Sequence, residues 1–203
     1  MNTIAKNSLP AIGSPLAGGF YMGLYLLDGL LQALIRAPAA NGFNAPLPWG
    51  ARGTKIEGAG SFNDGLANTR AMAEAGCAHA NWALGLSIDG HQDWFIPARD
   101  EAEIVYRVCK PTAQENWCSF RDGDNPSSVP AGYPYTADTP AQSNIEAFCQ
   151  GGDEALEDCG YWTSTQDGPN GAWVQHFDDG TQHYGVKGYA RPAFAVRRIT
   201  VTP

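Results

Sequence analysis

The first strong pattern in the chain is a pair of apolar runs separated by two turn-forming residues. Residues 20–27 and 30–35 are almost entirely apolar, and Asp28-Gly29 lies between them. Asp-Gly is a preferred connection in tight β-hairpins, where both central residues need a positive φ. The second run taken alone is equally compatible with a helix. Because the turn favours strands, we predict a hairpin within residues 19–37.

Two later segments have the spacing of helices. Residues 63–64 offer an N-cap, and the helical pattern continues from there to about Leu86. Residues 100–109 form the second predicted helix, with acidic residues in the first turn and a proline beyond its end. The positions predicted to be buried are Leu66, Ala73, Cys77, Ala80 and Leu84 in the first helix and Ile104, Val105 and Val108 in the second.

Two segments lack a clear period. Residues 1–17 are interpreted as an extended N-terminal arm, followed by one domain over residues 18–203. Residues 110–160 are polar and form a long loop insertion, a kind of segment that is usually functional or packed by its own side chains. The last 40 or so residues return to strands. These elements predict an α+β domain.

The clearest turn near the C-terminus is Asp179-Gly180. Taken as a two-residue type I′ connection, it places His176 opposite His183 and Gln175 opposite Tyr184. The predicted faces of this hairpin are Trp173, Gln175, Phe177, Gln182 and Tyr184 on one side, and Val174, His176, Asp178, Thr181 and His183 on the other.

This hairpin and the insertion at residues 110–160 both contain residues with metal-ligand chemistry, but in both we favour an interpretation without a metal. His176 and His183 with Asp178 beside them have ligand chemistry, but no fourth ligand is visible, so we expect solvated or hydrogen-bonded imidazoles. Asp122, Asp124 and Asn125 are oxygen-rich, but the segment lacks the glutamate that closes a calcium loop. We therefore expect no metal and no cofactor.

Composition excludes several classes of function. A net charge of −8 argues against binding to a nucleic-acid backbone, and no stretch is apolar enough for membrane insertion. No convincing cleavage site follows residues 17–27, so we expect no secretory signal peptide. Five cysteines without a CxxC pair favour reduced thiols, although Cys149 and Cys159 could pair. No nucleophile elbow or phosphate-binding loop is present, so we expect no enzyme.

Several tracts together, in this order and spacing, resemble the DUF1566 (Lcl C-terminal-like) family. They are GGFYMG at 18–23, DGLANTRAMA at 64–73, DWFIPARDE at 93–101, GDNPSS at 123–128, YWTST at 161–165 and the segment 172–198. The likeness is greatest to phage tail members. It implies a C-type lectin-like fold, with two helices flanking a small twisted, mainly antiparallel sheet and with the termini close together. It brings no catalytic residues.

The resemblance implies recognition by loops and an exposed hairpin. The expected function is that of a tail tip or fibre protein of a tailed phage, located in the virion tail, that binds a host surface receptor, either glycan or protein. The N-terminal arm would contact other tail proteins, and a homo-oligomer, with a trimer favoured, is expected. Alternatives are a purely structural tail or capsid decoration protein and a bacterial surface adhesin. The candidate ligand-binding residues are Asp167, Asn170, Gln175, His176, Asp178, His183, Tyr184 and Tyr189.

Overall fold

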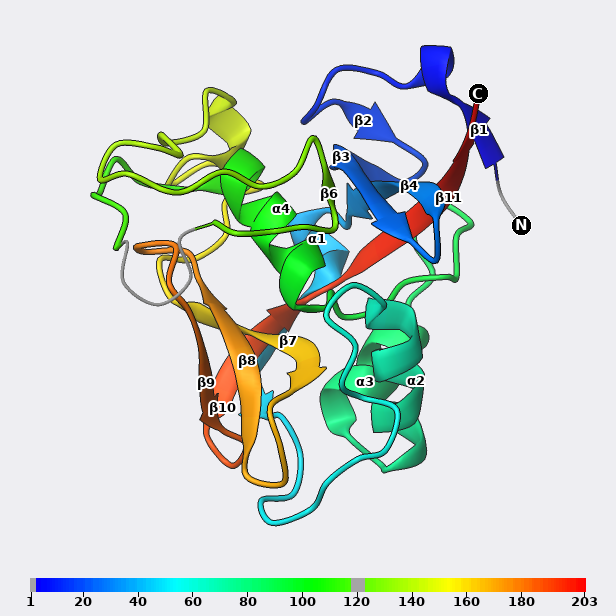
Figure 1. Ribbon diagram of the computed structural model, residues 1–203, viewed down its shortest axis with the longest axis vertical. Helices are drawn as coiled ribbons and strands as arrows, with labels where there is room; N and C mark the ends of the chain where they lie inside the picture. The colour runs from blue at the N-terminus through cyan, green and yellow to red at the C-terminus, as the bar shows by residue number, and fades with distance from the viewer. Residues whose placement is uncertain (1–2, 118–122) are drawn as a thin grey trace.

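The computed structural model describes residues 3–117 and 123–203, which contain more strand than helix, at 33% against 19% (Figure 1). The described strands form three sheets of six, two and three strands. Helix α4 lies at the centre of the molecule, between the largest sheet and the three-stranded sheet. None of the helices in the described part of the chain has the length and apolar character needed to cross a membrane.

The largest sheet contains both ends of the described chain. Its strands, in spatial order, are β1 (Thr3–Ala5), β11 (Val196–Thr202), β4 (Leu30–Arg36), β3 (Gly19–Leu27) and β2 (Pro15–Leu16), with β6 (Ser128–Val129) also paired to β3. Strand β1 is parallel to β11, with Thr3 opposite Thr200, and the other pairs are antiparallel. The segment interpreted as an N-terminal arm thus pairs with this sheet through β1 and β2.

The predicted hairpin around Asp28-Gly29 is confirmed. Leu27 lies opposite Leu30, and the two turn residues have φ values of 51° and 77°. Both values are positive, as the type I′ connection requires. The same turn therefore joins β3 to β4 and sets their register.

The predicted helix from residue 64 to Leu86 is two helices. Asp64 does cap α2 (Gly65–Glu74), since its carboxylate accepts from the backbone N–H of Ala67 at 3.0 Å. The chain then turns at Gly76, where φ is +81°, and α3 begins (Ala78–Leu84). Because the break changes the direction of the helix, the predicted face is only partly buried. Of the predicted positions, Cys77 and Ala80 are buried. Other buried residues are Asn68, Thr69, Met72, His79 and Ala83.

The expected fold class is wrong. Two helices flanking one small sheet were expected, whereas the described chain has a curled mixed sheet, two further sheets and four helices. The extra helices arise from the break at Gly76 and from the short α1 (Ala39–Gly42). The extra strands come from the N-terminal residues and from the insertion, which contributes β6. Periodicity did not reveal these short strands, because two or three residues carry no measurable period.

Helix α4 (Arg99–Cys109) is the centre of the main core. Its predicted position is correct, but its burial includes the acidic Glu101 and Glu103 as well as Ile104 and Val105. Glu101 has no exposed surface and accepts hydrogen bonds from Tyr25 Oη at 2.6 Å and from the backbone N–H of Ala98 at 2.7 Å. Other core residues around the helix are Met22, Leu34, Phe95, Phe148, Tyr161, Phe177 and Phe194.

The polar insertion is packed by its own side chains and by α4. Lys110 is buried and donates to Asn116 Oδ1 at 2.9 Å and to the carbonyl of Pro140 at 3.2 Å. Asn125 is fully buried and donates to Glu103 Oε2 at 2.6 Å. Asn125 thus serves a structural role, and Asp122, from the suggested calcium-binding group, lies outside the described residues.

The remaining elements include two 3₁₀ helices, Lys6–Ser8 and Glu146–Phe148. Of the cysteines in the described ranges, Cys77, Cys109, Cys149 and Cys159 are all free thiols. Cys118 lies outside those ranges.

Candidate functional site

The predicted site residues lie on and beside one three-stranded sheet. It consists of β7 (Gly160–Gln166), β8 (Gly171–His176) and β9 (Gln182–Val186), with β8 in the middle (Figure 1). A two-stranded sheet pairs β10 (Ala190–Phe194), which follows β9 in the chain, with β5 (Phe43–Pro48), which comes before α2.

The predicted register of the β8–β9 hairpin is wrong by two residues. Gln175 lies opposite Gln182 and Val174 opposite His183, and residues 177–181 connect the two strands. Gly180 has a φ of +79°, but Asp179 is not among the residues with positive φ, so the pair is not a type I′ turn. Because the shift is an even number of residues, the predicted division between the two faces survives.

Gln175 is not available to a ligand. It has no exposed surface, and its Oε1 accepts from Gln182 Nε2 at 2.7 Å. Gln182 Nε2 also lies 2.7 Å from the carbonyl of Arg99, the first residue of α4. The two glutamines therefore dock the hairpin onto the helix, a role that alternation along a strand does not reveal.

The face of the hairpin that carries Trp173 and Tyr184 has an exposed cluster of rings. Tyr184 is 54% exposed and packs edge-to-face on Trp173, with the ring centroids 6.3 Å apart. Phe62, 44% exposed, also packs edge-to-face on Trp173, with the ring centroids 6.2 Å apart. The Arg99 guanidinium stacks 3.6 Å above the Phe62 ring. We call Phe62, Trp173 and Tyr184, with Arg99, the aromatic patch.

Sequence reasoning did not predict the contribution of Phe62. It precedes the N-cap of α2 and lies more than 100 residues from Trp173 in the chain. An apolar residue just before a helix cap was the only available signal, and such residues usually pack on their own helix. The backbone N–H of Asp100 donates to the Phe62 carbonyl at 2.8 Å, and this contact brings the ring to α4.

Three other predicted residues lie in the loops at the end of the hairpin opposite His176. Asp167 and Asn170 are exposed in the β7–β8 loop, where the Asn170 carbonyl accepts from the backbone N–H of Lys187 at 2.9 Å. This loop is at the opposite end of β8 from His176, about 17 Å away at the usual rise of a strand. Tyr189 is 61% exposed in the β9–β10 turn. The predicted residues thus do not form a single site.

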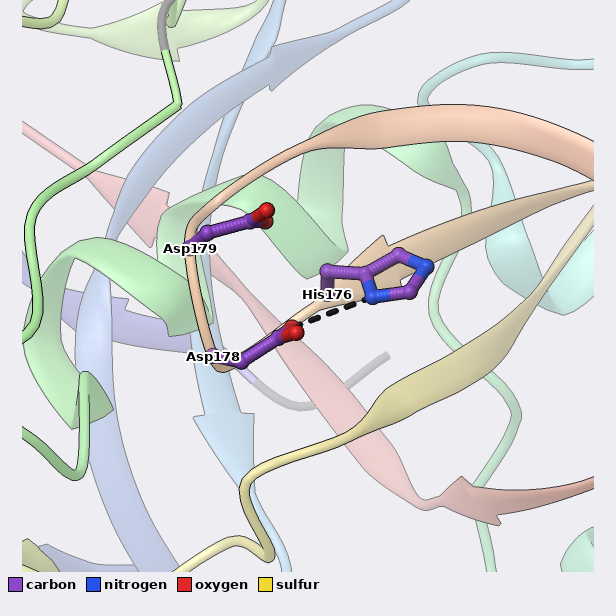
Figure 2. A group of neighbouring side chains, drawn as sticks. All are labelled: His176, Asp178 and Asp179. Carbon is purple, nitrogen blue, oxygen red and sulfur yellow. Dashed lines mark hydrogen bonds and ion pairs between the residues drawn. The ribbon is translucent and has the colours of Figure 1, made fainter.

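The connection between β8 and β9 brings the remaining polar candidates together. His176 Nδ1 lies 3.0 Å from Asp178 Oδ1, and the two point toward each other in Figure 2. His176 Nε2 lies 3.0 Å from His183 Nε2, although the two histidines are not directly opposite each other. Asp179 completes a group whose ligand atoms lie within 4.8 Å of one another. We call His176, Asp178 and Asp179 the tip cluster.

The electrostatics of the tip cluster are dominated by carboxylates. Burial raises the pKa of the Asp178 carboxyl, but hydrogen bonding and charge attraction to His176 outweigh burial, so the pKa is lowered overall. Asp158, in the loop before β7, has a raised pKa because of burial and because of the negative charges of Asp178 and Asp179. Asp158 was not among the predicted residues.

A groove elsewhere on the molecule holds none of the predicted site residues. Its volume is about 680 Å³, and it lies between β3, α4 and the insertion, where Met22, Leu24, Ile104, Val108, Pro130 and Ile145 contribute to its walls. Its walls are mainly apolar.

Comparison with known proteins adds no relative: no family model matches the chain, and no curated protein matches it either.

Proposed function

We propose that this chain is a tail tip or fibre protein of a tailed phage and that it binds the host cell surface. The order and spacing of the tracts that resemble phage tail proteins support this, from GGFYMG at 18–23 to the segment 172–198. A sequence resemblance concerns the family alone, so the binding role needs support from the surface of the molecule.

The aromatic patch is the observation that carries the proposal. Large rings exposed next to one another are uncommon on a protein surface and typically mark a contact site. Tyr184 also carries a hydroxyl, and the Arg99 guanidinium, which is ion-paired with Asp100, lies against the Phe62 ring. Rings with nearby polar groups suit the face and hydroxyls of a sugar, so the proposed receptor is a surface glycan.

The N-terminal residues supply a second surface for assembly. Ile12, before β2, is 55% exposed, and we propose that this part of the chain contacts other tail proteins. A homo-oligomer, with a trimer favoured, would place several aromatic patches at one end of the tail. Several weak sites then act together and raise the overall affinity.

A cell-binding assay with fluorescently labelled protein tests the proposal. The Tyr184→Ala and Phe62→Ala variants should each reduce binding to host cells by about 10-fold, as expected for residues central to an interface. Leu30→Ala is a matched control, because Leu30 is 52% exposed and belongs neither to the aromatic patch nor to the N-terminal surface, and it should leave cell binding unchanged. Absence of binding by the unchanged protein, together with normal adsorption of virions that lack it, would contradict the proposal.

A structural tail or capsid protein is the second candidate. Strand β1 is the last strand of the large sheet, and an edge strand can pair with another chain. In that case Ile12→Ala would impair assembly, while the aromatic patch variants would leave adsorption unchanged.

A further inference from the structure

A chain of close polar contacts runs from β9 into the tip cluster. His183 Nδ1 lies 2.9 Å from the carbonyl oxygen of Tyr184, and His183 Nε2 lies 3.0 Å from His176 Nε2. His176 Nδ1 then lies 3.0 Å from Asp178 Oδ1. The centroids of the two imidazole rings are 5.0 Å apart, whereas their Nε2 atoms are only 3.0 Å apart. The Nε2 atom of each ring is therefore on the side that faces the other ring.

The positions of the protons follow from these contacts. A carbonyl oxygen only accepts, so His183 Nδ1 carries a hydrogen. A neutral His183 therefore has a bare Nε2, and the hydrogen between the rings belongs to His176 Nε2. When both rings are neutral, His176 Nδ1 is a lone pair that faces the Asp178 carboxylate. Two electron-rich atoms at 3.0 Å repel each other unless a cation lies with them.

The surroundings of His176 Nδ1 are strongly negative. The carboxylate of Asp179 comes from the same connection and extends toward the same region as Asp178 in Figure 2. Asp158 adds a third carboxylate, and its pKa is raised first by burial and then by the negative charges of Asp178 and Asp179. Arg191 lies on the opposite, Nε2, side of the ring, where a Cβ on Gly160 would meet both Arg191 Nη1 and His176 Nε2.

We propose that His176 Nδ1 and the carboxylates of Asp178 and Asp179 bind a divalent transition metal ion such as Zn²⁺ or Mn²⁺. One imidazole with two carboxylates is a ligand set that suits these ions. His183 is not a ligand but a positioning residue, because it accepts from His176 Nε2 and so directs Nδ1 to the metal, as a second hydrogen-bond partner of a ligating histidine does.

The geometry requires only small side-chain rotations. Ligands at about 2.1 Å from one ion lie about 3–4 Å from one another, and the tip-cluster atoms lie within 4.8 Å. Asp178 is 36% exposed and has room to turn. The site is separate from the aromatic patch, so the inference does not depend on the glycan proposal.

Equilibrium dialysis of EDTA-treated protein against ZnCl₂ and MnCl₂, with metal analysis, tests the site. We expect one ion per chain and affinity at least about 10-fold weaker in His176→Gln and in Asp178→Asn. His183→Gln should weaken binding by about 10-fold through the loss of orientation. Asp167→Asn, on the far loop of the same sheet, removes one exposed carboxylate and should leave affinity unchanged.

Melting temperatures in EDTA identify variants that fail to fold, and only variants that melt as the parent does are compared. In the parent, ZnCl₂ should raise the melting temperature, and His176→Gln should abolish the rise. Absence of saturable binding would overturn the proposal. The close contact between His176 Nδ1 and Asp178 Oδ1 would then be explained by a proton on Nδ1 in place of a metal ion. Equal affinity in the parent and in His176→Gln would overturn it as well, since the ion would then be held by surface carboxylates alone.

Discussion

Arg36 of β4 and Glu154 of the insertion form an ion pair across 118 positions of the chain. Arg36 Nη2 lies 3.0 Å from Glu154 Oε2, and Nη1 donates to the Glu154 carbonyl at 2.8 Å. The arginine has no exposed surface, and its guanidinium lies 4.8 Å from the centre of the Phe148 ring. This pair therefore fastens the end of the insertion to the large sheet.

Removal of Glu154 should strongly destabilise the fold. In Glu154→Ala the buried Arg36 charge loses its partner, and we expect the free energy of unfolding to fall by about 3–5 kcal/mol. Glu57→Ala is a control from an exposed pair, with Lys55, and should cost less than about 1 kcal/mol. Chemical denaturation measures both, and a similar small loss in the two variants would show that Arg36 finds another partner.

Asn125 should be sensitive to a change of one atom. Its Nδ2 donates to Glu103 Oε2 at 2.6 Å and to the Asp100 carbonyl at 2.8 Å. Asn125→Asp replaces this donor by an oxygen beside a carboxylate, so we expect a loss of about 3 kcal/mol in the free energy of unfolding at neutral pH. Asn144→Asp, at an exposed position of the same insertion, should change it by less than about 0.5 kcal/mol. Equal effects would contradict a structural role for Asn125.

Alanine substitutions at Gly29 and Gly180 distinguish the cost of backbone strain from the cost of steric crowding. Both have a φ near +78°, at +79° and +77°. A Cβ at Gly29 meets nothing within 4 Å, whereas one at Gly180 would lie 2.6 Å from Tyr106 Cε1. Gly29→Ala should cost about 1–2 kcal/mol of unfolding free energy, from strain alone. Gly180→Ala should cost at least about 1 kcal/mol more. Thermal and chemical denaturation compare the two, and equal losses would mean that Tyr106 moves aside.

Glu101 should make stability depend on pH. Burial raises its pKa to about 7, against the opposing effects of hydrogen bonds from Tyr25 and Ala98 and the charge of Arg198. Between pH 4.5 and 7 the folded chain keeps this proton and the unfolded chain has lost it, so this residue makes stability fall as pH rises through that window. The change is at most about 3 kcal/mol.

The variant Glu101→Gln isolates this effect. Glutamine does not titrate, so the unfolding free energy of the variant should lack the decline between pH 4.5 and 7. The slopes are compared rather than the absolute values, because the amide cannot accept all of the hydrogen bonds of the carboxylate. Parallel pH profiles would show that Glu101 is ionised throughout.

Local signals in the sequence predicted the elements that local interactions control. The Asp28-Gly29 turn, the Asp64 cap and the start of α4 were all correctly placed, because each depends on residues within a few positions. The Asp179-Gly180 turn had the same signal but a different conformation. Its conformation is set by Gly180 packing on Tyr106 and by the glutamines that dock the hairpin on α4.

The candidate sites depend on residues that are distant in the chain. Tyr184 and His176 were predicted from an alternating pattern, and alternation does determine which side of a strand a residue faces. It does not say which neighbours cover that side, so Gln175 was wrongly taken as a contact residue and Phe62 and Asp158 were missed.

The sequence by itself determined the first hairpin, the central helix and the division of the last hairpin into two faces, because these follow from turn chemistry and side-chain period. Only the tertiary structure decided how many sheets form, how the insertion packs and which polar groups meet at the tip cluster. Those outcomes depend on burial and charge pairing between segments far apart in the chain, as between Arg36 and Glu154, and no local pattern records them.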